Sequence, residues 1–287
     1  MINRIARNLH TIKVTQEGDF LLISDLHWDN PKCDRELLTS HLKQAQQIGA
    51  KIIVNGDFFC LMQGKYDPRR SKKDILPEHN KANYIDAVIE DAVQWWAPYA
   101  NDLLLIGYGN HETSIIKNLE TDPLQRFVDL LNVTAGSNVQ VGGYGGALDF
   151  RINVSNSGQR TNVVMKYYHG FGGGGAVTKG VIQDQRMISM MEGYDIIWMG
   201  HVHELYHHVN MVERYDNHNK RIQTKQVHQV RTACYKEEYE DGFGGYHIEK
   251  GRPPKPMGGY WLKVGANRTQ NNGKRILYPF IEFKQTR

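Results

Sequence analysis

The alternation of apolar and polar positions predicts short buried strands and amphipathic helices in the first half of the chain. Residues 20–24 form an apolar run that ends in polar side chains, and positions 37–48 then repeat apolar residues at helical spacing before Gly49. A second apolar run follows at 51–55. Strand, helix and strand in this order indicate a βαβ unit, which is typical of a parallel sheet with crossover helices.

A longer excursion over about residues 60–100 interrupts this alternation. It contains a basic, proline-interrupted stretch and then a helix over 84–96, which ends at Pro98 because proline does not continue a helix. A third buried strand is predicted at 102–108. The next helix is predicted to begin only after Asp122, because an aspartate followed by proline is a favourable helix start.

The second half of the chain, from about Asn138 onward, is predicted to be rich in strands. β-Branched and aromatic residues alternate there with polar residues between clusters of glycine. Two apolar runs, at 162–168 and 194–199, flank a glycine-rich loop and a helix over 181–192. The last part, at about 205–287, has the pattern of antiparallel strands joined by polar loops.

Length and composition indicate a compact protein with a large core. The chain has 287 residues, of which 40% are hydrophobic and 23% are charged, so neither disorder nor a fibrous repeat is expected. We find no repeat of fixed period and no long linker. We therefore predict a single α/β domain over residues 1–287, with an insertion at about 60–100 and C-terminal strands at about 205–287.

Cysteine usage, charge and the N-terminus favour a reduced, cytoplasmic setting. Cys33, Cys60 and Cys234 are too widely spaced for a CxxC zinc site or a disulfide framework, so we expect free thiols. The apolar runs are far shorter than the roughly 20 residues of a membrane span, and no secretory signal is recognisable, so no membrane partner is expected. The net charge of +4 is a mild preference for polyanionic partners.

Five short polar motifs each follow one of the predicted strands. In an open α/β sheet, loops at the carboxyl ends of strands converge even when they are distant in sequence. The motifs supply aspartate, asparagine and histidine, whose oxygen and nitrogen donors suit Mn, Fe or Zn in a catalytic site. They are Asp25-Leu26-His27, Gly56-Asp57, Gly109-Asn110-His111-Glu112, His169-Gly170 and Gly200-His201-Val202-His203.

The ordered set DxH, GD, GNHE, H and GHxH resembles the calcineurin-like metallophosphoesterases over about residues 20–205. The resemblance implies an αββα sandwich of two sheets and two divalent metal ions, with Mn expected first and Fe, Zn, Ni or Mg as alternatives. It implies one metal bound by Asp25, His27 and His203, a second bound by Asn110, His169 and His201, and Asp57 as the bridge.

The chemistry of such a pair of metals agrees with phosphoester cleavage. Two cations about 4 Å apart share a carboxylate and lower the pKa of bound water, so that a metal-bound hydroxide can attack phosphorus in line. The metals also neutralise charge that builds on the phosphate oxygens. His111 is beside the ligand Asn110, and we predict that it protonates the leaving oxygen or holds the phosphate.

Several neighbouring polar residues have a plainer interpretation than a place at the metals. Asp29 and Asn30 are interpreted as turn formers rather than partners of the ligands. Glu112 is interpreted as a first-turn acid that stabilises a helix. His207 and His208 alternate along a predicted strand, so at most one of them faces the metals, and we interpret both as strand or surface histidines.

Three further segments also have two interpretations. Gly172–Gly175 lacks the GK[ST] ending of a phosphate-binding loop and is interpreted as a flexible loop near the site. Tyr144 and Phe243 stand among glycines and are interpreted as parts of hairpin turns rather than as base-stacking platforms. The basic run Lys65–Lys73 is either a solvated charge run, which we favour slightly, or a contact for a nucleic-acid backbone.

The expected enzyme is a metal-dependent phosphoric ester hydrolase, and a phosphodiesterase or nuclease is the first choice. Serine/threonine protein phosphatases of the same superfamily carry GDxxDRG, whereas this chain has Gly56-Asp57-Phe58-Phe59-Cys60, with apolar residues in place of phosphate-holding ones. The alternatives are a phosphomonoesterase on nucleotides or small metabolites and a non-catalytic metal-binding scaffold. The chain also resembles uncharacterised bacteriophage phosphoesterases. DNA or RNA is the candidate partner, and the oligomeric state stays open.

Overall fold

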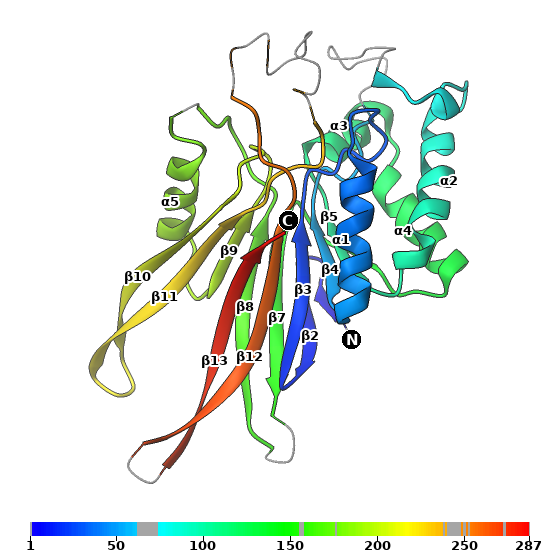
Figure 1. Ribbon diagram of the computed structural model, residues 1–287. Helices are drawn as coiled ribbons and strands as arrows, with labels where there is room; N and C mark the ends of the chain where they lie inside the picture. Colours follow the sequence, from blue (N-terminus) through cyan, green and yellow to red (C-terminus); the bar gives the residue numbers. More distant parts are fainter. Residues whose placement is uncertain are drawn as a thin grey trace.

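The computed structural model describes most of the chain, and the two ends and eight internal gaps lie outside it. The described residues are 2–61, 74–154, 158–175, 177–237, 239, 248, 251, 253–271 and 274–286. The basic run Lys65–Lys73 and Phe243 fall outside this set. In the described part, two mixed sheets and five α-helices form an α/β structure (Figure 1).

The six-stranded sheet contains the first three strands that were predicted from the sequence. β3, β4 and β5 run parallel, so their carboxyl ends lie at one edge of the sheet. β12 pairs with β3 in antiparallel register, and so places the C-terminal hairpin beside the beginning of the chain. In spatial order the strands are β13 (Lys274–Gln285), β12 (Tyr260–Asn271), β3 (Glu17–Ile23), β4 (Lys51–Asn55), β5 (Leu103–Gly107) and β6 (Gln140–Val141).

The seven-stranded sheet contains most of the strand-rich second half. β8, β9 and β11 run parallel to one another, while β7 and β10 are antiparallel to their neighbours β8 and β11. In spatial order the strands are β1 (Ile2–Ala6), β2 (Leu9–Thr15), β7 (Gly145–Asn153), β8 (Arg160–Tyr168), β9 (Ile196–Met199), β11 (Arg221–Arg231) and β10 (Tyr206–Asp216).

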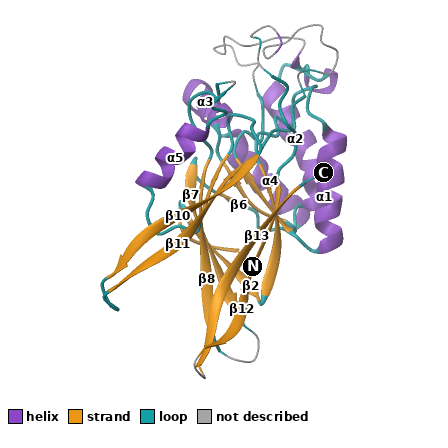
Figure 2. Ribbon diagram, turned by 60° about the vertical axis from the view of Figure 1, so that its left-hand side comes forward, coloured by secondary structure: helices purple, strands orange, loops and turns teal. Residues whose placement is uncertain are grey.

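Helices cover the outer side of the six-stranded sheet and one end of the seven-stranded sheet. α1, α2 and α4 lie together on one side of the molecule, and α5 lies on the other side, beside β9 (Figures 1 and 2). The helices are α1 (Arg35–Ile48), α2 (Tyr84–Trp96), α3 (Asn110–Leu119), α4 (Pro123–Ala135) and α5 (Val181–Met190), with short 3-10 turns at Pro77–His79 and Ala97–Tyr99.

Two apolar cores hold these layers together. One lies between the sheets, where Leu22, Phe150 and Trp198 are fully buried. The other lies between the six-stranded sheet and its helices, and includes the fully buried Trp96 and Phe127. Alternation of inward and outward side chains along β7 and β8 explains why polar residues appear at every second position of these strands.

One predicted boundary is wrong. The first helix after the third strand was predicted to begin only after Asp122. It begins earlier, because α3 starts at Asn110, directly after β5. Its buried face consists largely of His111, Glu112 and Ile115, so it has no stripe of apolar residues to reveal it. The helix predicted after Asp122 does exist as α4, and its cap is as predicted, since the Asp122 side chain accepts a hydrogen bond from the Gln125 N–H.

Among the described residues, no helix has the length and apolar character that a bilayer crossing requires. The three cysteines are buried free thiols, as the spacing predicted.

Candidate metal centre

The five motifs lie at the ends of five strands and meet where the two sheets adjoin. Asp25 follows β3, Asp57 follows β4 and Asn110 opens α3 after β5. His169 follows β8, and the Gly200–His203 loop follows β9. The two sheets are tied together here, because the Asn55 side chain donates to the Tyr168 carbonyl at 3.2 Å and the His201 N–H donates to the Asp25 carboxylate at 2.9 Å.

Asp25, His27 and His203 form a first cluster whose candidate ligand atoms all lie within 4.8 Å of one another. His203 Nε2 is 3.4 Å from Asp25 Oδ1. His27 is 3% exposed, and neither of its ring nitrogens has a hydrogen-bond partner among the residues that the structure describes. Buried polar atoms are nearly always satisfied, so an unpartnered buried imidazole beside a carboxylate fits a metal ligand.

Asp57, His169 and His201 form a second cluster of the same spacing. Asn110 belongs to it, since its Oδ1 lies 3.2 Å from His169 Nε2 and 2.8 Å from His201 Nδ1. His169 Nε2 is 3.3 Å from Asp57 Oδ2 and 3.9 Å from Asp25 Oδ1, so the two clusters adjoin. The structure thus brings together all seven side chains that the sequence nominated as ligands.

Hydrogen bonds to backbone carbonyls orient the two imidazoles of the second cluster. His169 Nδ1 lies 2.8 Å from the Asn55 carbonyl, and His201 Nε2 lies 2.9 Å from the Gly172 carbonyl. A carbonyl can only accept, so each of these nitrogens carries the proton and donates. The other nitrogen of each ring faces Asn110 Oδ1, and that of His169 also faces Asp57 Oδ2. A cation placed between them would find nitrogen and oxygen donors together, as metal-binding histidines and their carboxylate partners provide.

The backbone at the centre adopts a conformation that side-chain-bearing residues rarely adopt. Five of the candidate ligands have a left-handed φ: Asp25 53°, His27 47°, Asp57 47°, His201 72° and His203 55°. Each such residue costs on the order of 1–3 kcal/mol and persists only where the surroundings enforce it. Strain of this kind concentrates at functional sites, so it marks these loops independently of the motifs.

Two glycines of the motifs are required by close packing against the ligands. A Cβ at Gly56, whose φ is +78°, would lie 2.5 Å from His169 Nδ1. A Cβ at Gly200 would lie 2.5 Å from Asp25 Oδ2. The glycines in GD and GHxH therefore allow ligands from different strands to approach one another.

The carboxylates of the centre attract positive charge, as the pKa values of their neighbours show. Burial lowers the pKa of His169, but the carboxylates of Asp57 and Asp25 outweigh it and raise this pKa to about 9. Burial raises the pKa of Asp57, yet His169, His111 and His27 hold it well below its usual range. Burial, reinforced by His111, holds the pKa of His27 well below its usual range, so this imidazole is neutral and able to bind a cation.

His111 borders the centre and is held from two sides. Its Nδ1 donates to the Cys60 carbonyl at 2.6 Å, and its N–H donates to Asp57 Oδ1 at 3.0 Å. Its Nε2 lies 3.9 Å from Asp57 Oδ2. His111, His27 and Cys60 form a third group of possible ligands, but burial raises the pKa of the Cys60 thiol to about 12, which disfavours the thiolate that metals bind.

Glu112 has the structural role that was predicted. Its two carboxylate oxygens accept from the Phe59 and Gly109 N–H groups, each at 2.8 Å, so it joins the start of α3 to the loop after β4. It is fully buried, and burial together with Asp57 raises its pKa to about 8.

Asp29 has more than the predicted role of a turn former. It is 2% exposed, and its carboxylate accepts from the Cys60 and Leu61 N–H groups and from the Tyr84 hydroxyl. It thereby fixes the carbonyl that orients His111. Asn30 does form a turn, since its side chain accepts from the Lys32 N–H.

Other predictions near the centre are corrected or confirmed by the contacts. Tyr144 does not stand in a hairpin: it lies between β6 and β7, which belong to different sheets, and its ring packs edgewise on His169. Phe58 and Phe59 do not line the site, because both are fully buried in the helix-covered core. His207 is a strand histidine, as predicted, and stacks on His228.

Sequence reasoning missed the residues whose hydrogen bonds support the first motif at Asp25 and the last motif at Gly200. Ser24 donates to Asp25 Oδ2 at 2.5 Å and also contacts Thr232, to which Trp198 donates. The fully buried Arg231 donates to the Gly200 carbonyl and to Asp184 on α5. The only sequence signal for Arg231 is a charged residue at the end of a strand run, which is too common to single it out.

No protein-family model matches this chain, and no curated protein matches it in sequence. The groups of buried aspartate, histidine and cysteine side chains have the spacing to hold a metal ion.

Proposed function

We propose that this protein is a dinuclear metal-dependent phosphoesterase of the calcineurin-like superfamily, and specifically a phosphodiesterase or nuclease. The observation that carries the proposal is the meeting of two ligand clusters at Asp57 and Asp25, with imidazole nitrogens and carboxylate oxygens facing one another. Oxygen and nitrogen donors without thiolate suit catalytic divalent metals. The αββα sandwich expected of this superfamily is consistent with the two packed sheets and their helices.

Each side chain has a distinct task in this proposal. Asp25, His27 and His203 hold one cation, and Asn110, His169 and His201 hold the other. Asp57 supplies the negative charge between them, and its charge acts on both His169 and His27. When bound, a pair of divalent cations supplies a nucleophile from water at neutral pH and neutralises charge on the phosphate oxygens.

His111 is the proposed proton donor. Because Nδ1 donates to the Cys60 carbonyl, the second proton of a charged ring resides on Nε2, on the side of Asp57. An alkoxide that leaves phosphorus at this edge would take the Nε2 proton. His111 has no carboxylate partner of its own apart from Asp57 among the described residues, so its position depends on the Cys60 carbonyl and on Asp29 behind it.

A diester is the better fit than a monoester. A phosphomonoester dianion carries one more charge than a diester, and the protein phosphatases match it with an arginine after the GD motif. Here that stretch reads Phe58-Phe59-Cys60, and the two phenylalanines turn into the core. The basic run Lys65–Lys73 that also favoured a nuclease lies outside the described residues.

Two chromogenic esters test the proposal. The chelated protein is reloaded with Mn and assayed on bis-p-nitrophenyl phosphate and on p-nitrophenyl phosphate. Hydrolysis of the diester in preference to the monoester supports the proposal, and Asp57→Asn must abolish it. The reverse preference would indicate a phosphomonoesterase, and no activity on either ester with any divalent metal would indicate a metal-binding scaffold.

A further inference from the structure

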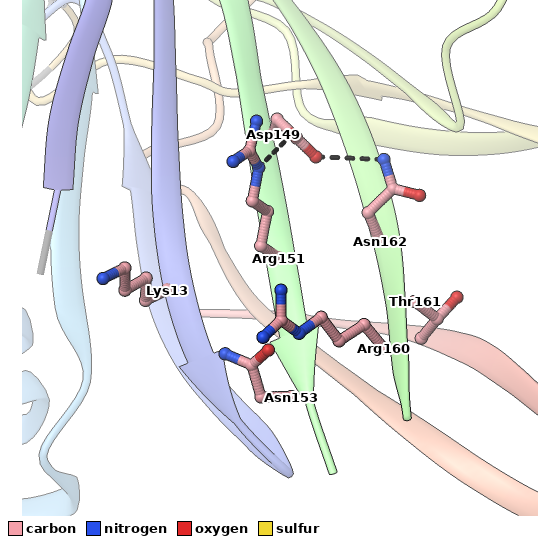
Figure 3. Close-up of a pocket in the computed structure, with 7 residues that line it drawn as sticks. All are labelled: Lys13, Asp149, Arg151, Asn153, Arg160, Thr161 and Asn162. Carbon is pink, nitrogen blue, oxygen red and sulfur yellow. Dashed lines mark hydrogen bonds and ion pairs between the residues drawn. The ribbon is translucent and has the colours of Figure 1, made fainter. Parts of the chain in front are cut away.

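A basic concavity lies on the outer face of the seven-stranded sheet, on strands that carry none of the motifs along their length. Its volume is about 440 Å³. Side chains from three neighbouring strands, β2, β7 and β8, surround it (Figure 3). They are Lys13, Asp149, Arg151, Asn153, Arg160, Thr161 and Asn162.

Strand register places like charges side by side in this concavity. Lys13 is directly opposite Arg151, and Arg151 is directly opposite Asn162. The next row outward pairs Asn153 with Arg160. The register thus gathers three cations, Lys13, Arg151 and Arg160, on the same outward face of neighbouring strands. An anion bound among them would meet more positive than negative charge.

Of the three cations, only Arg151 has an ion-pair partner in the described part of the chain. Arg151 Nε donates to Asp149 at 2.8 Å, and Asp149 also accepts from the Asn162 amide at 3.0 Å. Figure 3 shows these two contacts fixing Arg151 and Asn162 in place. Lys13 and Arg160 are exposed and form no ion pair with any residue that the structure describes. The concavity therefore keeps two uncompensated positive charges beside fixed amide groups.

We infer that this concavity binds phosphate groups of a nucleic-acid strand, as an exosite remote from the metal centre. Cations and amides that surround an open concavity suit phosphate oxygens, which carry charge but no sequence information. No aromatic side chain lines it among the described residues, so it has no platform for stacking bases. A single small anion would bind weakly at so exposed a site, whereas a polyanion also gains from the release of its counterions.

The spacing along β8 sets the length of strand that reaches both sites. Arg160 is the first residue of β8, and His169 follows its last residue. Nine residues of extended chain span on the order of 30 Å. At the roughly 3.4 Å per nucleotide of a B-form strand, about nine nucleotides cover this distance, and a more extended single strand covers it with fewer. That a nucleic acid is also the substrate rests on the proposed function, whereas binding to the concavity does not.

Binding is tested with a fluorescein-labelled single-stranded DNA of about 25 nucleotides, with phosphorothioate linkages that resist cleavage. Fluorescence anisotropy with the metal-loaded protein gives Kd over a range of salt concentrations. The test variant is Lys13→Gln/Arg160→Gln. The matched control is Lys43→Gln/Arg186→Gln, which removes the same two charges from exposed positions on α1 and α5.

We expect the test variant to bind at least about tenfold more weakly at about 50 mM salt, with the slope of log Kd against log salt reduced by about 1.4, at about 0.7 for each lost contact. The control variant should retain most of the affinity. Equal losses in both variants, no binding by the parent protein, or binding to anionic phospholipid vesicles in place of DNA would overturn the inference.

The proposed function is tested separately in the same preparations. Hydrolysis of bis-p-nitrophenyl phosphate needs no exosite, so the test variant should hydrolyse it at the parental rate. Loss of DNA binding with unchanged hydrolysis supports both conclusions. DNA binding that depends on Lys13 and Arg160, in a protein with no esterase activity, would support the inference of an exosite and refute the proposed phosphoesterase activity.

Discussion

Replacement of Arg231 by methionine is expected to destabilise the fold and loosen the last motif together. Arg231 is fully buried, and its guanidinium donates to Asp184 on α5, to the Tyr206 hydroxyl and to the Gly200 carbonyl. The substitution leaves the Asp184 carboxylate, whose side chain is 3% exposed, without its cation. Breaking a buried pair in this way costs about 3–5 kcal/mol. For a chain of this length, that corresponds to a Tm lower by roughly 6–10 °C.

A double substitution separates the two effects. Asp184→Leu added to Arg231→Met removes the buried charge, so most of the lost stability should return. Metal affinity should not return, because the Gly200 carbonyl still lacks the Arg231 guanidinium, and only the Val202 N–H remains as a donor to it in the loop that carries His201 and His203. Thermal melts and Mn titrations measure the two quantities.

An exposed ion pair provides the control for this experiment. The side chain of Arg221 is 65% exposed and lies 3.9 Å from Asp216, so Arg221→Met should cost no more than about 1 kcal/mol and leave metal binding unchanged. The assigned role of Arg231 would be refuted if Arg231→Met lowered the stability as little as Arg221→Met, or if the double variant bound Mn as tightly as the parent.

Three further changes give expected outcomes of different kinds. Gly56→Ala places a Cβ 2.5 Å from His169 Nδ1 at a left-handed φ, so elemental analysis should find metal loss even if the protein folds. His111→Ala should lower kcat by about 10²-fold or more with both metals retained, and the loss should be greater for poor leaving groups than for good ones. Burial and its neighbouring imidazoles lower the pKa of His207 to about 4, so the unfolded chain binds more protons, and stability is lost as pH falls from about 6.5 towards 4. Melts at about pH 7 and pH 5 should show a smaller drop in Tm for His207→Gln than for the parent, and an unchanged drop for His218→Gln, an exposed histidine in the turn between β10 and β11.

The sequence predicted those parts of the fold in which local pattern and burial agree. The apolar run at β4 and the helical spacing of α1 were both recognisable, because each buries one continuous apolar face. α3 was missed because its buried face is made of site residues. The pairing of β12 with β3 could not be predicted either, because nothing in the sequence of either strand specifies a partner more than 200 residues away.

The same distinction holds at the candidate site. The convergence of the seven candidate ligands could be predicted, since the motifs are contiguous in sequence and each follows a strand. The supports of the ligands could not, because they are single residues whose meaning appears only on folding. Asp29 looks like a turn former until its contacts with Cys60 and Leu61 are seen, and Arg231 carries no motif at all.

The metal content of the purified protein is the direct test of a dinuclear centre. After loading with Mn and exhaustive dialysis, elemental analysis should find about two metal ions per chain in the parent protein. Asp57→Asn, which removes the charge shared by the clusters, should hold fewer. A chain that retains no metal, together with hydrolytic activity that chelators do not diminish, would contradict a dinuclear centre.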